Sequence, residues 1–265
     1  MRAARDGVSI RFEARGEGAP LLVIPGLGLD LHAFEPFAAL LERDFTCVLI
    51  DNRGAGDSDA PRGPYSVGDL AADAAAVLEA SGARPAFVLG HSMGGFTAIE
   101  LALRSPAVVR GLLLVSTAAS GDLERLGQTA EARAALERRS GPPEEIARGN
   151  LAACLTPRFL VERPDEFSRL VAGRLAHPPK GRGLSGQRAA AVAFDATSRL
   201  GGIRVPAAVV HGDADRVVGI ACGRALAASI PGASFHLLEG VGHMPFWEAP
   251  EALAAIARRL AARQA

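Results

Sequence analysis

The sequence of 265 residues has few cysteines, few aromatic residues and no excess of charge of either sign. Its 3 cysteines are far apart, which excludes a disulfide framework and offers no metal-binding spacing. Arginine and lysine together number 29, as do aspartate and glutamate, and Lys180 is the only lysine. Because no basic stripe or acidic tail stands out, we expect no nucleic-acid partner.

Long apolar runs are also missing. No stretch approaches the roughly 20 residues that a membrane-spanning helix needs, so we expect no membrane association. Residues 1–7 carry no apolar signal core before the first expected strand. We therefore expect a cytoplasmic protein, a monomer or a homodimer, that acts on a small molecule. The 265 residues, 49% of them hydrophobic, fit one large domain or a core with an inserted lobe.

Short apolar runs alternate with helical patterns along most of the chain. Most of these runs are continuous rather than alternating, which predicts burial on both faces and hence a parallel sheet. The expected strands are 8–13, 21–24, 45–50, 86–89, 112–115, 207–210 and 235–238. The expected helices are 33–42, 66–81, 96–104, 220–229 and 250–262. Strands that alternate with helices predict a doubly wound α/β fold.

Residues 118–202 break the alternation of strands and helices, because no convincing strand pattern occurs among them. The helix-like pieces there are 122–139, 143–148, 157–161, 164–176 and 185–199. We interpret this segment as a helical lid inserted into the sheet domain. The alternative is a set of ordinary surface helices with no role in the site.

The segment Gly90-His91-Ser92-Met93-Gly94-Gly95 lies between an apolar strand and a helical pattern. A G-x-S-x-G pattern in this context is a nucleophile elbow, with the serine on a strained turn. We expect glycine at 90 and 94 because a Cβ there would collide with the neighbouring strand or helix. Ser92 is therefore the candidate nucleophile.

A serine hydroxyl needs a base, and the base needs an acid that orients it. Functional groups in open parallel sheets gather at the carboxyl ends of strands. Asp213 and Asp215 follow the strand at 207–210, and His243 follows the strand at 235–238. The chain order serine, aspartate, histidine is the order expected after a nucleophile elbow.

Five motifs together resemble the α/β-hydrolase superfamily, in its lidded branch of esterases, enol-lactone hydrolases and carbon–carbon bond hydrolases. They are Pro25-Gly26-Leu27-Gly28, the run from Asp51 to Ser58, the run from Gly90 to Gly95, the run from His211 to Asp215, and Gly242-His243 with Glu248 and Pro250. The resemblance spans essentially the whole chain. It implies a mostly parallel sheet of about eight strands, a core of residues 1–117 and 203–265, and a lid of residues 118–202.

The resemblance also implies roles for single residues. Ser92 matches the nucleophile, His243 the general base and acid, and Asp215 the orienting acid. Asp213 is the rival acid, which we expect to bond within its own loop. Both carboxylates follow the strand at 207–210, so either of them lies near enough to the histidine loop to be considered.

The same pattern implies an oxyanion hole made of the backbone N–H groups of Met93 and Leu27. The chain departs from the commoner pattern at Pro25, where a histidine often precedes the glycine. The run from Asp51 to Ser58 matches a structural turn beside the elbow, and we expect neither Asp51 nor Asp57 to be catalytic.

Pocket residues are harder to read from the sequence. The candidates are Phe34, His91, Phe159 and Met244. The alternative is that these side chains pack the lid on the core. Arginines at 125, 158 and 188 suit a substrate carboxylate, although a solvated helix face is the favoured explanation for any single one of them.

The sequence thus predicts a hydrolase without cofactor or metal that cleaves a small carboxylic ester or lactone through an acyl-enzyme. Carbon–carbon bond hydrolysis of a dienoic diketo acid, or amide cleavage, would use the same three residues. A lyase, cyclase or ligand-binding member of the fold is the third alternative, because fold does not determine function.

Overall fold

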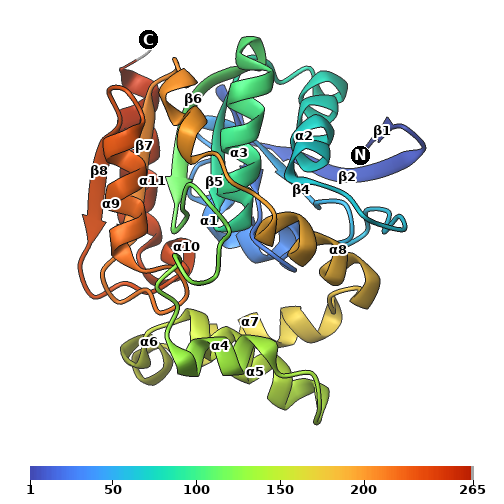
Figure 1. The fold of residues 1–265 in the computed structure, drawn as a ribbon, viewed down its shortest axis with the longest axis vertical. Coiled ribbons are helices and arrows are strands. Elements are labelled where there is room, and N and C mark those ends of the chain that lie inside the picture. Colours follow the sequence, from blue (N-terminus) through green and yellow to red (C-terminus); the bar gives the residue numbers. More distant parts are fainter. Residues whose placement is uncertain (264–265) are drawn as a thin grey trace.

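The computed structural model describes residues 1–263, which form one sheet with helices on both faces (Figure 1). The strands are β1 Arg2–Arg5, β2 Val8–Arg15, β3 Ala19–Ile24, β4 Phe45–Ile50, β5 Ala86–His91, β6 Val109–Val115, β7 Ala207–Gly212 and β8 Ser234–Leu238. Their order across the sheet is β1-β2-β4-β3-β5-β6-β7-β8. β1 and β2 pair antiparallel, and every pairing from β4 to β8 is parallel. The predicted doubly wound α/β fold is confirmed.

Alternate residues of the central strands enter two separate apolar clusters. Leu22 and Ile24 of β3 pack with α2 Val67–Ser81, α3 Met93–Arg104 and α9 Ile220–Ser229. Leu21 and Val23 of the same strand pack in the second cluster, with α1 Glu35–Ala39 and α11 Pro250–Ala262. The period of two along each strand therefore divides the core into one layer on each face of the sheet.

The edge strand β8 differs from the expectation of full burial. All of its residues are at least partly exposed, since nothing pairs with its outer edge among the described residues. β1 extends the sheet at the other edge and was not distinguished from the sequence, because its Arg-Ala-Ala-Arg composition carries no strand signal.

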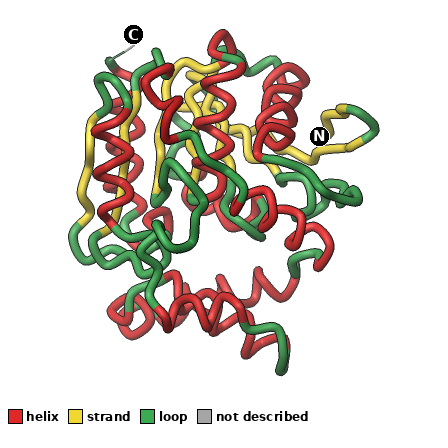
Figure 2. The backbone as a smooth tube through the Cα atoms, in the orientation of Figure 1, coloured by secondary structure: helices red, strands yellow, loops and turns green. Residues whose placement is uncertain are grey.

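Residues 118–202 lie between β6 and β7 and contain five α-helices. These are α4 Ala130–Glu137, α5 Pro143–Cys154, α6 Pro157–Glu162, α7 Pro164–Ala176 and α8 Gly181–Val192. Figure 1 shows α4 to α7 below the sheet, and Figure 2 shows loops between them and the strand ends. The helices thus lie beyond the carboxyl ends of the parallel strands.

Three expected helices are shorter than the sequence suggested. The pattern at 185–199 belongs to α8, which ends at Val192, and to a separate 3₁₀ turn, Thr197–Gly202. The pattern at 122–139 forms a helix only over Ala130–Glu137, because Gly127 has a positive φ of 64° and Thr129 caps the new helix. The pattern at 33–42 divides into a 3₁₀ turn, Leu31–Phe34, and the short α1. The left-handed conformation of Gly127 ends the turn before it, so the helix begins only after the capping residue Thr129.

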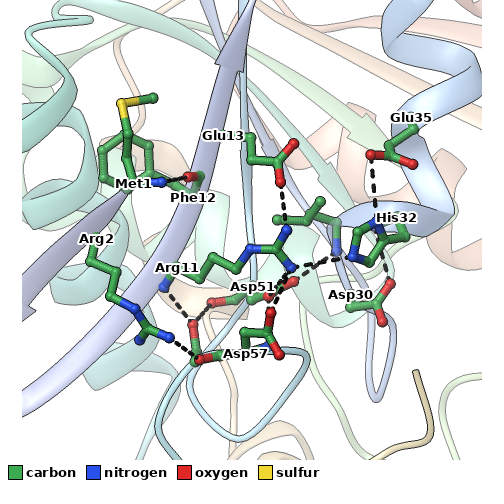
Figure 3. Close-up of polar contacts among 12 residues, drawn as sticks. Met1, Arg2, Arg11, Phe12, Glu13, Asp30, His32, Glu35, Asp51 and Asp57 are labelled. Carbon is green, nitrogen blue, oxygen red and sulfur yellow. Dashed lines mark hydrogen bonds and ion pairs between the residues drawn. The ribbon is translucent and has the colours of Figure 1, made fainter. Parts of the chain in front are cut away.

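The run from Asp51 to Ser58 forms a turn that holds neighbouring loops together. Asp51 is fully buried and accepts backbone N–H groups from Leu31 at 2.9 Å and Asp57 at 2.8 Å. Figure 3 shows the Arg11 guanidinium between Asp57, 3.0 Å away, and His32, 3.2 Å away. These contacts favour the structural interpretation of this motif.

Candidate active site

Ser92 lies at a sharp turn between β5 and α3, with φ 53° and ψ −120°. This conformation is strained for a residue with a Cβ and persists only where the surroundings hold it. Its N–H donates to Val115 O at 3.0 Å, and its C=O accepts from the Thr117 hydroxyl at 2.7 Å. The elbow therefore presents the Ser92 side chain outward while both of its backbone groups are fixed.

The elbow glycines are required by close contacts, as predicted. A Cβ on Gly94 would meet the carbonyl oxygens of Ile24 and Pro25, and a Cβ on Gly90 would meet Gly94 O. Each of these contacts is with backbone of a packed element, so neither neighbour has room to move.

Asp215 follows β7 and is held from several directions. Its Oδ1 accepts the backbone N–H groups of Val217 at 2.8 Å and Val218 at 2.9 Å. Its Oδ2 lies 2.8 Å from His243 Nδ1 and 3.3 Å from His211 Nε2. Burial alone would raise the pKa of the Asp215 carboxyl, but the facing imidazoles and hydrogen bonds outweigh it and hold the pKa well below its usual range.

His243 is buried and its loop is fixed at both backbone groups. Its N–H donates to Cys154 O at 2.9 Å, and its C=O accepts from His91 Nε2, also at 2.9 Å. Since the ionised Asp215 carboxylate only accepts, Nδ1 of His243 must carry the proton. In the neutral imidazole, Nε2 is then free to accept a proton, which is the form a general base needs.

A cavity of about 210 Å³ lies beside the elbow and the histidine loop. Ser92 and His243 both line it, together with Leu27 and Met93. The rest of its wall is mainly apolar, from Phe96, Leu123, Leu126 and Leu136 among others. The structure therefore brings the sequence-predicted nucleophile, base and oxyanion-hole residues to one small, largely apolar space.

The four pocket candidates divide into two pairs. His91 and Met244 line the cavity, whereas Phe34 and Phe159 do not. Phe34 is fully buried and stacks on Phe246 with ring centroids 4.0 Å apart. Phe159 is buried at the start of α6. Both phenylalanines belong to the apolar cluster on one face of the sheet, so their side chains are used in packing.

The rival acid Asp213 has a different partner from the one expected. Its Oδ1 accepts the N–H of Gly240 at 2.7 Å, in the loop after β8, rather than a group of its own loop. It therefore ties two neighbouring loops at the edge of the sheet, whereas Asp215 faces His243.

Three polar residues near the site carry no sequence motif. Arg174 of α7 lines the cavity, and Gln187 of α8 is fully buried and accepts the N–H of Gly28, the residue after Leu27. Asn150 of α5 also lines the cavity, and its Oδ1 has no hydrogen-bond partner among the described residues. The predicted arginine at 188 lines the cavity too but pairs with Glu137 at 2.6 Å. Helix periodicity gives no signal for such residues, because their partners are distant in sequence.

Burial, together with the nearby His243, lowers the pKa of His91 to about 3. In the unfolded chain the pKa of a histidine is about 6.5. Between this pH and about pH 3, the unfolded chain therefore binds a proton at His91 that the folded protein does not bind. The contribution of neutral His91 to the free energy of unfolding is therefore complete above about pH 6.5 and is lost as the pH falls toward about 3. One such group contributes a slope of at most about 1.4 kcal/mol per pH unit.

We therefore expect the free energy of unfolding of His91→Gln to depend less steeply on pH than that of the wild type between pH 6 and about 4. Gln keeps an N–H donor for His243 O. Urea unfolding at several pH values measures the slope, and His177→Gln, at an exposed imidazole, is the control expected to leave it unchanged. Equal slopes for His91→Gln and the wild type would contradict the assigned burial effect.

The described part of the chain holds neither a cluster of metal-binding side chains nor a membrane-spanning helix. Within residues 1–263, no group of three or more histidine, cysteine, aspartate or glutamate side chains is placed to hold a metal ion. No helix in that range is long and apolar enough to span a bilayer.

A family model described as the alpha/beta hydrolase fold matches residues 19–250. The chain belongs to the α/β hydrolase family. A protein provisionally named carbamate hydrolase RutD, from Azorhizobium caulinodans, is 32% identical over 222 residues, which cover 84% of this chain and 83% of that protein. The 3-oxoadipate enol-lactonase 2 of Acinetobacter baylyi is 28% identical over 92% of this chain and 90% of its own.

Solved structures of α/β hydrolases share the fold over nearly the full length. The enol-lactonase from Burkholderia xenovorans LB400 superposes with a TM-score of 0.87 at 26% identity, covering 99% of this chain and 100% of that one. These relatives support assigning the chain as a hydrolase.

Proposed function

We propose that this α/β hydrolase cleaves a small carboxylic ester or lactone through an acyl-enzyme on Ser92. The observation that carries the proposal is the 2.8 Å contact of Asp215 Oδ2 with Nδ1 of His243, a residue that lines the same cavity as Ser92. This contact fixes the tautomer in which His243 Nε2 takes a proton.

The proposed reaction has two halves. His243 Nε2 accepts the Ser92 hydroxyl proton as Oγ forms a bond to the carbonyl carbon, and the carbonyl π electrons move to oxygen. The tetrahedral intermediate then collapses, and the alcohol leaves with the proton from His243. A water molecule, deprotonated by His243, attacks the acyl-enzyme and releases the acid and the free serine.

The proposed oxyanion hole uses two backbone donors. Met93 is the first residue of α3, so its N–H has no partner within the helix and lies at the positive end of the helix dipole. Leu27 lies in the loop after β3 and lines the same cavity. Each such donor contributes roughly 3 kcal/mol to transition-state stabilisation.

The size and lining of the cavity support a small substrate. About 210 Å³ is less than the roughly 300–1,000 Å³ of pockets for drug-sized ligands. The names of the relatives, which include an enol-lactonase and a provisional carbamate hydrolase, suggest acyl compounds of this size. Asn150 and Arg174 are the polar groups available from α5 and α7 to orient such a substrate.

A fluorophosphonate probe tests the proposal directly. We expect stoichiometric labelling that peptide mass spectrometry assigns to Ser92 and that stops turnover of a nitrophenyl ester. A panel of a nitrophenyl acetate, an enol lactone, a phenyl carbamate and a dienoic ring-cleavage product then compares substrate classes. Fresh protein that is never labelled at Ser92, or that consumes only the ring-cleavage product, would overturn the proposed function.

A further inference from the structure

Gly28 lies directly after Leu27 and is held on both of its backbone groups by side chains from residues 118–202. It is the third residue of a turn in which Leu29 N donates to Gly26 O at 3.1 Å, and its φ is 67°. A positive φ at this position, after a residue with negative φ, is typical of a type II turn. The turn leaves the N–H and C=O of Gly28 without partners in the loop itself.

The side chain of Gln187, in α8, accepts the hydrogen bond from the Gly28 N–H. Its Oε1 accepts from Gly28 N at 2.9 Å, and its Nε2 donates to Arg53 O at 2.9 Å. The orientation of the amide is fixed by chemistry, because a backbone N–H requires the oxygen and a carbonyl requires the NH₂. Gln187 is fully buried, so water offers neither group an alternative partner.

The Arg174 guanidinium of α7 donates a hydrogen bond to the C=O of Gly28. Two helices that are separate in sequence therefore fix one peptide segment of the loop after β3. These contacts join positions 146 and 159 residues apart along the chain.

Helix α8 packs closely on the loop that contains Gly54 and bonds to Tyr65. Gly183 packs so closely on Gly54 that a Cβ would collide with its backbone. The Tyr65 hydroxyl donates to Gly183 O at 2.8 Å, one turn before Gln187. The amide of Gln187 thus comes from a rigid support, as positioning groups require.

We propose that Gln187 is a positioning residue for the oxyanion hole. By accepting the Gly28 N–H, it fixes the plane of the turn so that the adjacent Leu27 N–H remains directed to the cavity. Arg174 stabilises the same orientation from the carbonyl side. The inference rests on the proposed function, in which Leu27 N–H is an oxyanion donor.

Gln187→Met removes both hydrogen bonds at nearly constant volume. An oxyanion donor contributes about 10²–10³ in kcat, so a misdirected donor is expected to lower kcat by about 10- to 100-fold, with KM within about twofold. The matched control is Ser185→Ala, which removes a hydrogen bond of the same helix, from the Ser185 hydroxyl to Gly181 O at 3.0 Å, without touching Gly28, Gly54 or Tyr65. It is expected to keep the wild-type kcat, and thermal unfolding of both variants checks that each is folded.

A second variant and a second readout separate positioning from a general loss of structure. Gln187→Glu keeps an acceptor for Gly28 N–H in either protonation state, and it is expected to retain most of the wild-type kcat even at a lower Tm. The rate of phosphonylation by the fluorophosphonate should fall with kcat in Gln187→Met, because its P=O group uses the same oxyanion hole.

The outcomes distinguish this inference from the proposed function. A wild-type protein without ester turnover or Ser92 labelling overturns the proposed function and this inference with it. An active wild type with unchanged kcat in Gln187→Met, or with equal losses in Ser185→Ala or Gln187→Glu, overturns the positioning role alone.

Discussion

Replacing Ser92 with alanine is expected to lower kcat for ester hydrolysis by about a million-fold, which leaves the residual rate that binding and the oxyanion hole supply. The expected effect is this large because, in the proposed mechanism, the acyl-enzyme forms on Ser92 alone. The backbone bonds of Ser92 to Val115 O and from the Thr117 hydroxyl do not involve its side chain. The free energy of unfolding should therefore change little, and steady-state kinetics with thermal unfolding measures both quantities.

Ser116 supplies a close control for this substitution. It also has a positive φ, 49°, at the end of a central strand, and it is fully buried. Its hydroxyl has no hydrogen-bond partner among the described residues, and it does not line the cavity. Ser116→Ala is expected to keep wild-type kinetics. Substantial turnover by Ser92→Ala, or an equal loss in Ser116→Ala, would remove Ser92 from the mechanism.

Asp215→Asn is expected to lower kcat by about 10⁴-fold, the effect known for the equivalent change in a serine protease triad. The geometry gives the reason. The side-chain oxygen must stay where Oδ1 accepts the N–H groups of Val217 and Val218, so the new NH₂ group faces His243 Nδ1. His243 would then be protonated on Nε2 and could not accept the Ser92 proton.

Asp213→Asn is the matched comparison, since both carboxylates follow β7. Its side-chain oxygen can still accept the Gly240 N–H, which Asp213 holds at 2.7 Å. We expect kcat within a few-fold of the wild type, and a profile of kcat against pH for both variants makes the comparison. A large loss in Asp213→Asn with near-normal Asp215→Asn would show that the two roles are reversed.

The parts of the site that follow strands were predictable from the sequence. The elbow around Ser92, and the acid and histidine after β7 and β8, each depend on a local pattern of apolar residues followed by a fixed motif. The carboxyl ends of parallel strands bring such motifs together without further information. The resemblance favoured Asp215 over Asp213 as the acid, but the contacts of the two carboxylates, with His243 and with Gly240, depend on where each loop turns and could not be predicted.

The contributions of residues 118–202 were not predictable in the same way. Phe159 was a reasonable pocket residue by composition, yet it packs in the core cluster, while Arg174 and Gln187 carried no pattern at all. Their significance comes from contacts with Gly28 across more than a hundred residues. Periodicity reports the buried face of a helix and does not say which distant carbonyl or N–H it meets.

The attachment of Gly28 to α7 and α8 has a consequence for engineering. Exchanging residues 118–202 for the corresponding segment of a relative, in order to change substrate preference, would also exchange the supports of the loop after β3. If Gln187 positions the oxyanion hole as proposed, such a chimera needs an amide at the position of Gln187 and a cation at that of Arg174 in order to keep its rate. A change of substrate preference made in this way would then also change turnover.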